Sequence, residues 1–182
     1  MIYPIVAYGD PVLKKVAEPI VHGTDLSKTV ADLYETMYNA GGVGLAAPQI
    51  GMGIRLFVTD GKPMEEEDEP MDFKKVFVNP TVLGENGTPW AFEEGCLSIP
   101  GIRADVSRPE KVRIHYFDEH WNEFTEEYTG MAARIIQHEY DHLQGTLFVD
   151  RISAMKKRLL QSRLADISRG RAKADYRLRF AK

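Results

Sequence analysis

The sequence predicts a single compact α+β domain, in which antiparallel strands surround a central buried helix and a further helix lies near the C-terminus. Two patterns carry this prediction. Strand-like segments follow one another in the middle of the chain without alternating with helices, which argues against a parallel βαβ sheet. A later segment, residues 130–143, is apolar on nearly every side of its first turns, as is typical of a helix in the interior. Because 182 residues suit one domain, we expect residues 1–182 to form one unit, with 151–182 as a basic C-terminal helix and tail.

The first half of the chain predicts one helix and then strands. Residues 24–39 are expected to be helical because apolar side chains recur there at helical spacing. These are Leu26, Val30, Leu33, Tyr34 and Met37, and Gly41 and Gly42 then end the helix. Residues 54–58, 76–78 and 112–116 are predicted strands because they are rich in β-branched and aromatic residues. We expect hairpin turns at Asn86-Gly87 and at residues 118–122, and a solvated loop at the acidic run 65–69.

Two helices are predicted after the strands. The first covers residues 130–143 and ends before Gly145. The second follows Ser153, a good N-cap residue, and continues through Ser168 to a stop at Gly170. On this last helix we expect Met155, Leu159 and Ile167 to pack on the core.

The charge distribution separates the body of the chain from its last part. Residues 151–182 contain 11 Lys/Arg and two Asp, a net charge of +9, whereas residues 1–150 carry −13. A basic tail on an acidic body suggests a separate electrostatic partner for the tail. No stretch approaches the ~20 apolar residues that a membrane-spanning helix needs, and the first ten residues lack the features of a signal or transit sequence. We therefore expect a cytoplasmic protein without a membrane partner, and nothing in the sequence suggests more than a monomer.

The strongest chemical motif is His138-Glu139-Tyr140-Asp141-His142 in the predicted central helix. Residues four apart share one face of a helix, so the two imidazoles can converge on one divalent ion. Glu139 follows the first histidine and can reach a metal-bound water without binding the metal itself. A pair of solvated histidines is the simpler alternative, but leaving imidazoles unpartnered on so apolar a helix would cost several kcal/mol.

A third protein ligand is expected because catalytic metals usually have three protein ligands and one open position. Downstream of His142 only Asp150, Asp166 and Asp175 are acidic, and no His or Cys follows. Upstream, residues 94–98 read Glu-Gly-Cys-Leu-Ser and contain the single cysteine, Cys96. A lone cysteine is often only a small buried residue. Beside glycine in a loop, its thiolate also suits a soft metal, and the Leu97 amide could then face the open site.

A third segment, residues 42–49, reads Gly-Val-Gly-Leu-Ala-Ala-Pro-Gln. Its small residues let the backbone approach a ligand, and Gln49 offers a neutral amide donor. The segment lacks the Lys-Ser/Thr of a phosphate-binding loop, which argues against nucleotide binding.

Together the three segments, in this order and with comparable spacing, resemble the peptide deformylases of bacterial type. Residues 9–13 also look like the opening of that family, so the resemblance covers the chain to about Ser153. It implies one divalent metal ion bound by Cys96, His138 and His142, and a general acid–base, Glu139. Gln49 and the Leu97 amide would hold the oxyanion. The substrate-binding residues implied are Gly42, Val43, Gly44, Glu94, Arg103, Met131, Arg134 and Ile135.

The resemblance also implies the reaction and its partners. The expected activity is hydrolysis of the N-formyl group from the formyl-methionine that starts nascent polypeptides, with release of formate. The ligand set by itself favours zinc, whereas the family implies Fe²⁺, with Zn²⁺, Ni²⁺ or Co²⁺ as substitutes. Arg134 stands where many relatives have an aliphatic residue, so we expect its stem to form a pocket wall and its charge to reach solvent. The basic segment 151–182 is expected to dock on the ribosome, with a purely solvated helix as the alternative. The side chains expected to contact RNA phosphates are Arg163, Arg169, Arg171, Lys173, Arg177 and Arg179.

Two other function classes remain open from the motifs alone. A general HExxH metallopeptidase would use the same two histidines and glutamate, although its third ligand usually lies C-terminal to them. A non-catalytic homologue could use the cysteine and histidines as a structural metal site, which generally needs a fourth protein ligand. Hydrolysis of a formylated peptide but not of internal peptide bonds would separate deformylase from peptidase.

Overall fold

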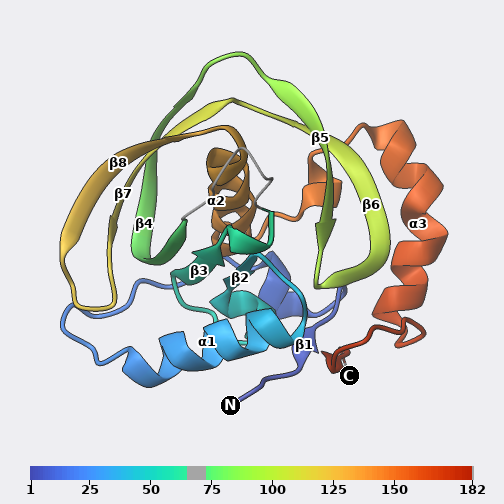
Figure 1. The fold of residues 1–182 in the computed structure, drawn as a ribbon. Helices are drawn as coiled ribbons and strands as arrows, with labels where there is room; N and C mark the ends of the chain where they lie inside the picture. Colours follow the sequence, from blue (N-terminus) through green and yellow to red (C-terminus); the bar gives the residue numbers. More distant parts are fainter. Residues whose placement is uncertain (65–72, 182) are drawn as a thin grey trace.

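The computed structural model describes residues 1–64 and 73–181, and its largest sheet has five antiparallel strands in the order β2-β3-β4-β7-β8 (Figure 1). Its strands are β2 (Gly44–Ala46), β3 (Leu56–Asp60), β4 (Lys74–Asn86), β7 (Lys111–Phe117) and β8 (Glu123–Thr129). A separate antiparallel pair joins β5 (Trp90–Cys96) to β6 (Ile99–Arg108). The first and last strands, β1 (Ile5–Val6) and β9 (Leu178–Arg179), pair in parallel.

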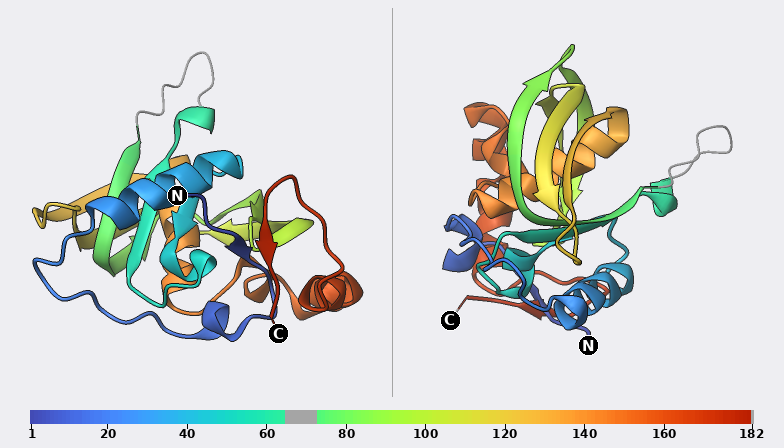
Figure 2. Two further views of the ribbon diagram at one scale, coloured as in Figure 1. Left: turned by 90° about the horizontal axis from the view of Figure 1, so that it is seen from below. Right: turned by 90° about the vertical axis from the view of Figure 1, so that its left-hand side faces the viewer.

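Three α-helices accompany the strands in the described residues: α1 (Ser27–Asn39), α2 (Gly130–Leu143) and α3 (Ala154–Ser168). Short 3₁₀ turns lie at Pro11–Lys14, Ala47–Ile50, Lys62–Met64 and Phe148–Asp150. Figure 1 shows α2 in the middle, with β4, β7 and β8 on one side and the β5–β6 pair on the other, and Figure 2 gives two further views. The predicted fold, antiparallel strands around a central helix with a C-terminal helix, is thereby confirmed.

The helix α2 is central because its sequence supplies apolar residues on most of its surface. Ala133, Ile135 and Ile136 are buried against Phe57, Phe77 and Tyr116 of the large sheet, in one core cluster. The helix ends where Gly145 adopts a φ of +70°, and a Cβ there would lie 2.5 Å from the Lys14 carbonyl oxygen. Glycine is therefore required at this stop, as the sequence predicted.

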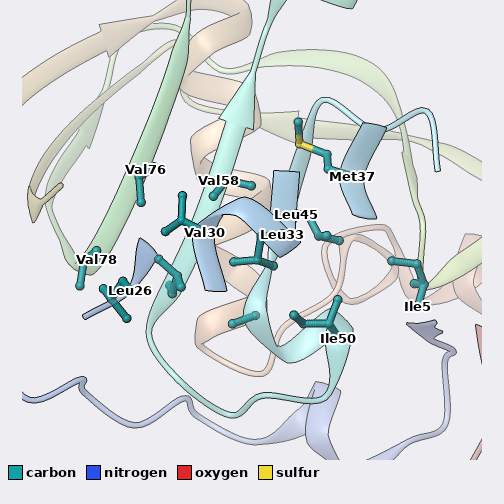
Figure 3. Packing of buried hydrophobic residues seen from close by; sticks show 12 residues of the cluster. Ile5, Leu26, Val30, Leu33, Met37, Leu45, Ile50, Val58, Val76 and Val78 are labelled. Carbon is teal, nitrogen blue, oxygen red and sulfur yellow. The ribbon is translucent and has the colours of Figure 1, made fainter. Parts of the chain in front are cut away.

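Two other clusters complete the core. The first lies between α1 and the edge of the large sheet, where Leu33 and Met37 pack with Leu45 and Val58 (Figure 3). The second lies between β6 and α3 and contains Ile99, Val106, Leu164 and Ile167. Packing in the three clusters fixes the positions of β2, β5 and α2, and residues of all three elements line the candidate site.

Several local predictions are corrected by the structure. The first helix begins at Ser27, because Asp25 Oδ1 accepts the Ser27 N–H (3.0 Å) and the preceding residues form a turn. Asn86-Gly87 does turn the chain, with a Gly87 φ of +83°, but it forms no hairpin. The chain leaves the large sheet there, because β4 pairs with β7 whereas β5 pairs with β6. The second predicted hairpin is confirmed: β7 and β8 pair, and the Asp118 N–H bonds the Asn122 carbonyl (3.0 Å).

The inward face of α3 was also predicted wrongly in part. Ile167 is buried, but Met155 and Leu159 are 76% and 78% exposed. The buried residue Leu164 lies nine positions after Met155, about half a turn out of phase at ~3.6 residues per turn, so Met155 points away from the core. Ser153 caps the helix as predicted, its Oγ accepting the Lys156 N–H (3.2 Å). The acidic run 65–69 lies outside the described residues, and no described helix is long and apolar enough to cross a membrane.

Candidate active site

Three potential metal ligands converge between the end of β5 and the C-terminal half of α2. Their donor atoms, from Cys96, His138 and His142, all lie within 4.8 Å of one another. The two histidines meet because they are one helical turn apart on α2, and Cys96 reaches them from the last position of β5. Its Sγ lies 3.4 Å from Nε2 of His142. No fourth His, Cys, Asp or Glu joins this group among residues 1–64 and 73–181.

The chemistry of these donors fits a divalent transition-metal ion. Burial, reinforced by the charges of His138 and Arg108, lowers the pKa of His142 well below its usual value, so its imidazole is neutral. His138 Nδ1 is bonded to Glu94 Oε2 (3.0 Å), which leaves Nε2 as the ligand atom. A carboxylate behind a metal-binding histidine is a common way to fix the ring. Two imidazoles and a thiolate suit zinc or iron and leave one coordination position open.

Glu139 is a buried carboxylate beside these ligands. It is 5% exposed, and its Oε2 has no hydrogen-bond partner in the described part of the chain. Burial raises the pKa of Glu139 to about 7, although the charges of His138 and Arg108 partly oppose the shift. A carboxyl group with a pKa near neutrality can both accept and return a proton, as a general acid–base must.

The β2 strand passes directly against Glu139. A Cβ built on Gly44 would lie 2.4 Å from Glu139 Oε1, far inside a normal contact distance. Glycine at position 44 is therefore needed to make room for this carboxylate. Small residues in 42–49 were predicted to let the backbone approach a ligand. At Gly44 the group that the backbone approaches is a side chain of the protein itself, Glu139.

Gln49 lies beside Cys96, in the 3₁₀ turn Ala47–Ile50. Its Oε1 accepts the Ala46 N–H (2.9 Å), which fixes the orientation of the amide. Its Nε2 then lies 3.5 Å from Cys96 Sγ and 3.3 Å from Ser98 Oγ. A buried N–H donor is thereby directed at the ligand group.

A network of buried charges supports the site from behind. Glu94 accepts two hydrogen bonds from Arg108, at 2.6 and 2.9 Å, and contacts His138 as described. Burial opposes its charge, but the hydrogen bonds from Arg108 and His138 outweigh burial and hold the pKa of Glu94 well below its usual range. Arg108 continues to Asp141 (2.9 Å), which also binds Arg151 (2.5 Å). Glu94 is thus a permanent carboxylate that orients His138.

The expectation that Arg134 sends its charge to solvent is wrong. Arg134 is 3% exposed, and its Nη1 donates to Glu94 Oε1 (2.7 Å) and to the Val106 carbonyl (3.0 Å). Its Nη2 donates to the Trp90 carbonyl (2.6 Å), and the guanidinium lies 4.1 Å from the Trp90 ring centre. The charge stays inside because Glu94 and these strand carbonyls would otherwise be buried with fewer partners.

One cavity of about 630 Å³ joins these features. Thirteen of the fourteen predicted site residues line it, namely Gly42, Val43, Gly44, Gln49, Glu94, Cys96, Leu97, Arg103, Met131, Arg134, Ile135, His138 and Glu139. His142 is the exception and lies behind the cavity, 1% exposed.

Other parts of this site were not predicted from the sequence. Phe92 lines the cavity and could have been found, since it lies two residues before Glu94 and strand side chains alternate between faces. Arg108 and Asp141 complete the charge network, and an acid within so apolar a helix was a signal of a buried partner. Residues 173–176 also line the cavity, and no local pattern in the sequence indicates it.

Comparisons with known proteins agree with this geometry. The sequence profile of the family described as polypeptide deformylase matches residues 2–158. A peptide deformylase of Cytophaga hutchinsonii is 56% identical over 181 residues, 99% of this chain and 98% of that protein. The structure of peptide deformylase 1B of Arabidopsis thaliana with an inhibitor superposes with a TM-score of 0.83 at 34% identity, covering 92% of this chain and 91% of that one. A peptide deformylase structure from Legionella pneumophila gives 0.82 at 38% identity over 95% and 99% of the two chains.

Proposed function

The chain belongs to the polypeptide deformylase family, metal-dependent hydrolases that remove N-formyl groups from nascent chains, and we propose that it performs this reaction in the cavity between β5 and α2. One observation carries the proposal. Three potential metal ligands lie beside a buried carboxyl group with a raised pKa, and all of these residues except His142 line one cavity.

We assign the metal to Cys96, His138 and His142. Bound there, a divalent ion supplies a polarised water near neutral pH and an electrophile for the formyl oxygen. Glu94, fixed by Arg108, orients the His138 ring. The group has an open position rather than a fourth protein ligand in the described residues, which favours a catalytic site over a structural one.

In the proposed mechanism Glu139 accepts the proton of the attacking water, and its burial keeps the pKa near the working pH. Gln49 Nε2 and the Leu97 N–H donate to the oxyanion that develops on the formyl oxygen as the water oxygen bonds the formyl carbon. Losing one such donor typically costs roughly 2.7–4 kcal/mol. Glu139 then gives its proton to the methionine nitrogen as the C–N bond breaks, and formate leaves.

The substrate is proposed to lie along β2 and α2. Gly42, Val43 and Gly44 would run beside the peptide backbone, and Met131 and Ile135 would form the methionine pocket. Glu94 and Arg134 border this pocket with their charges turned toward each other. Arg103 lies at the edge of the cavity, 58% exposed in its side chain, bonded to Glu93 (2.9 Å), where it can guide the peptide.

The decisive test is formate release from formyl-Met-Ala-Ser by anaerobically purified, iron-loaded protein. Glu139→Gln removes the acid–base but keeps the ligands, so the metal should stay bound while kcat falls by about 10²–10⁴. Near-native turnover of this variant would overturn the role of Glu139. Cleavage of internal peptide bonds would favour a general peptidase instead.

We propose Fe²⁺ as the physiological metal, with Zn²⁺, Ni²⁺ and Co²⁺ as substitutes. The donor set binds all four, and affinity alone favours zinc or nickel over ferrous iron, so the proposal rests on family membership. Metal analysis after anaerobic purification, with kcat measured after reloading each ion, tests it. Iron-free native protein, or a zinc form as active as the iron form, would refute it.

We further propose that residues 1–182 act as one catalytic domain, monomeric and cytoplasmic, whose basic segment 151–182 docks on the ribosome. Support comes from the exposed basic side chains of α3 and its C-cap, namely Lys156, Arg158, Arg163 and Arg169. Some predicted phosphate contacts are already engaged: Arg163 bonds the Gly101 carbonyl, Arg171 pairs with Asp166 and Arg179 with Asp10. Charge reversal of Lys156, Arg158 and Arg169 should abolish salt-sensitive ribosome co-sedimentation without changing peptide deformylation. Unchanged co-sedimentation would refute the docking role.

A further inference from the structure

The C-terminal segment returns from α3 to the active site. After α3 the chain turns at Gly170, with a φ of +75°, and runs back to pair β9 with β1. The Ile5 N–H bonds the Arg177 carbonyl and the Ala7 N–H bonds the Arg179 carbonyl, both at 2.8 Å. Figure 2, left, shows this red segment beside the dark blue first strand. The return places residues 173–176 in the wall of the active-site cavity.

Tyr176 makes the direct contact. Its hydroxyl donates a hydrogen bond to the Leu97 carbonyl (2.8 Å), and its ring, like the Leu97 side chain, packs against the core cluster beneath α1. Burial raises the pKa of Tyr176 to about 12, with the charges of Cys96 and Asp175 adding to the shift, so the hydroxyl stays protonated and can donate. The next carbonyl, that of Ser98, accepts the Tyr8 N–H (2.8 Å). The paired chain ends therefore hold two consecutive carbonyls of the turn between β5 and β6.

This turn carries two groups of the proposed mechanism, the thiolate of Cys96 and the N–H of Leu97. The Leu97 carbonyl lies in one rigid peptide plane and the Leu97 N–H in the preceding one, and the two planes are joined at the Leu97 Cα. A hydrogen bond on the carbonyl therefore restricts the rotation of the plane that follows Leu97 relative to the plane that carries its N–H. We propose that Tyr176 is a positioning residue of the deformylation site, which holds the Leu97 turn so that its N–H faces the oxyanion. The inference rests on the proposed function, and Tyr176 lies beyond residue 158, where the family match ends.

The test is Tyr176→Phe, which removes the hydroxyl and keeps the ring. Deleting the whole tail is less useful, because it would also remove β9 and the core contacts of Leu178 and Phe180. Tyr3→Phe is the matched control, because Tyr3 packs on the same cluster as Tyr176. Its hydrogen bond to Thr36 (3.0 Å) is made by the backbone N–H, which the substitution leaves in place. Metal content, thermal unfolding, kcat and KM for formyl-Met-Ala-Ser are measured for both variants, for wild type and for Glu139→Gln.

We expect Tyr176→Phe to lower kcat by about 3- to 10-fold, the range of one neutral hydrogen bond, with KM within twofold and full metal content. Tyr3→Phe should match wild type. An unchanged kcat, or a loss that follows unfolding or metal release, would overturn the positioning role. If wild type releases no formate, or Glu139→Gln is fully active, the proposed function fails instead, so the two failures are distinguishable.

Discussion

Replacing Gly44 with alanine tests the position of Glu139 most directly. The new Cβ would lie 2.4 Å from Oε1 and 2.8 Å from Cδ and Cγ of Glu139, where ordinary contact begins at 3.4 Å. The carboxylate must therefore move by about 1 Å. A shift of this size in a catalytic group costs on the order of 10²-fold in rate, or about 2.7 kcal/mol in the activation barrier. We expect kcat of Gly44→Ala to fall about 100-fold, with metal content unchanged.

The assay is formate release by the iron-loaded enzyme, with metal content measured on the same samples. Gly84→Ala is the matched control, since Gly84 is also in a strand, β4, and a Cβ there meets no atom within 4 Å. The double variant Gly44→Ala/Glu139→Gln should be as slow as Glu139→Gln alone, because both changes act through one group. A Gly44→Ala enzyme within about threefold of wild type would refute the reasoning. So would a double variant that is slower again by the full 100-fold.

Three further predictions concern the ligand, the acid–base and α3. Cys96→Ser replaces a thiolate by a hard, protonated hydroxyl and should weaken iron binding at least tenfold, as measured by competition with a chelator. Equal affinity of the variant and wild type for iron would show that Cys96 is only structural. Burial raises the pKa of Glu139 to about 7 from 4.5. Once a chelator has removed the metal, the native state therefore holds a proton on Glu139 between pH 4.5 and 7 that the unfolded state releases. The free energy of unfolding should then fall as pH rises from 4.5 to about 7, by roughly 3 kcal/mol at most. Urea unfolding should show this slope in wild type but not in Glu139→Gln, and identical slopes would contradict it. Ser153→Ala removes the cap on the Lys156 N–H and should lower the free energy of unfolding in urea by about 1 kcal/mol. The control Ser162→Ala, at an exposed position of the same helix, should not lower it. Equal effects of the two substitutions would argue against a cap.

Features set by local periodicity could be predicted from the sequence. The helix Gly130–Leu143 has the predicted bounds, because its apolar surface and its terminal glycine are both encoded within 16 residues. The three motifs were predicted to share one site because each supplies a different part of the same chemistry. The structure places them around one cavity, although the roles of the individual residues remain predictions.

Features that depend on contacts between distant segments could not be predicted. Arg134 is charged and was expected to reach solvent, yet β5 and β6 provide a carboxylate and two carbonyls that bind it inside. The strands that pair with β4 and β5 depend on how the sheets cover α2. The Asn86-Gly87 turn therefore predicted a hairpin between neighbouring strands, whereas β4 pairs with β7 and β5 with β6. Tyr176 lies 79 residues from its partner Leu97, and no spacing rule connects the two.

The parallel pairing of β1 with β9 has a consequence for how the enzyme matures during its own synthesis. Ile5 emerges from the ribosome early, but its partner Leu178 is made about 170 residues later. Closing so long a loop is entropically costly and belongs to the slow, late steps of folding. The turn that carries Cys96 can therefore gain its Tyr176 contact only after 79 further residues beyond Leu97 have been translated. A newly made copy must therefore have translated residues 176–179 before it has the finished wall of the cavity in which it would process other nascent chains.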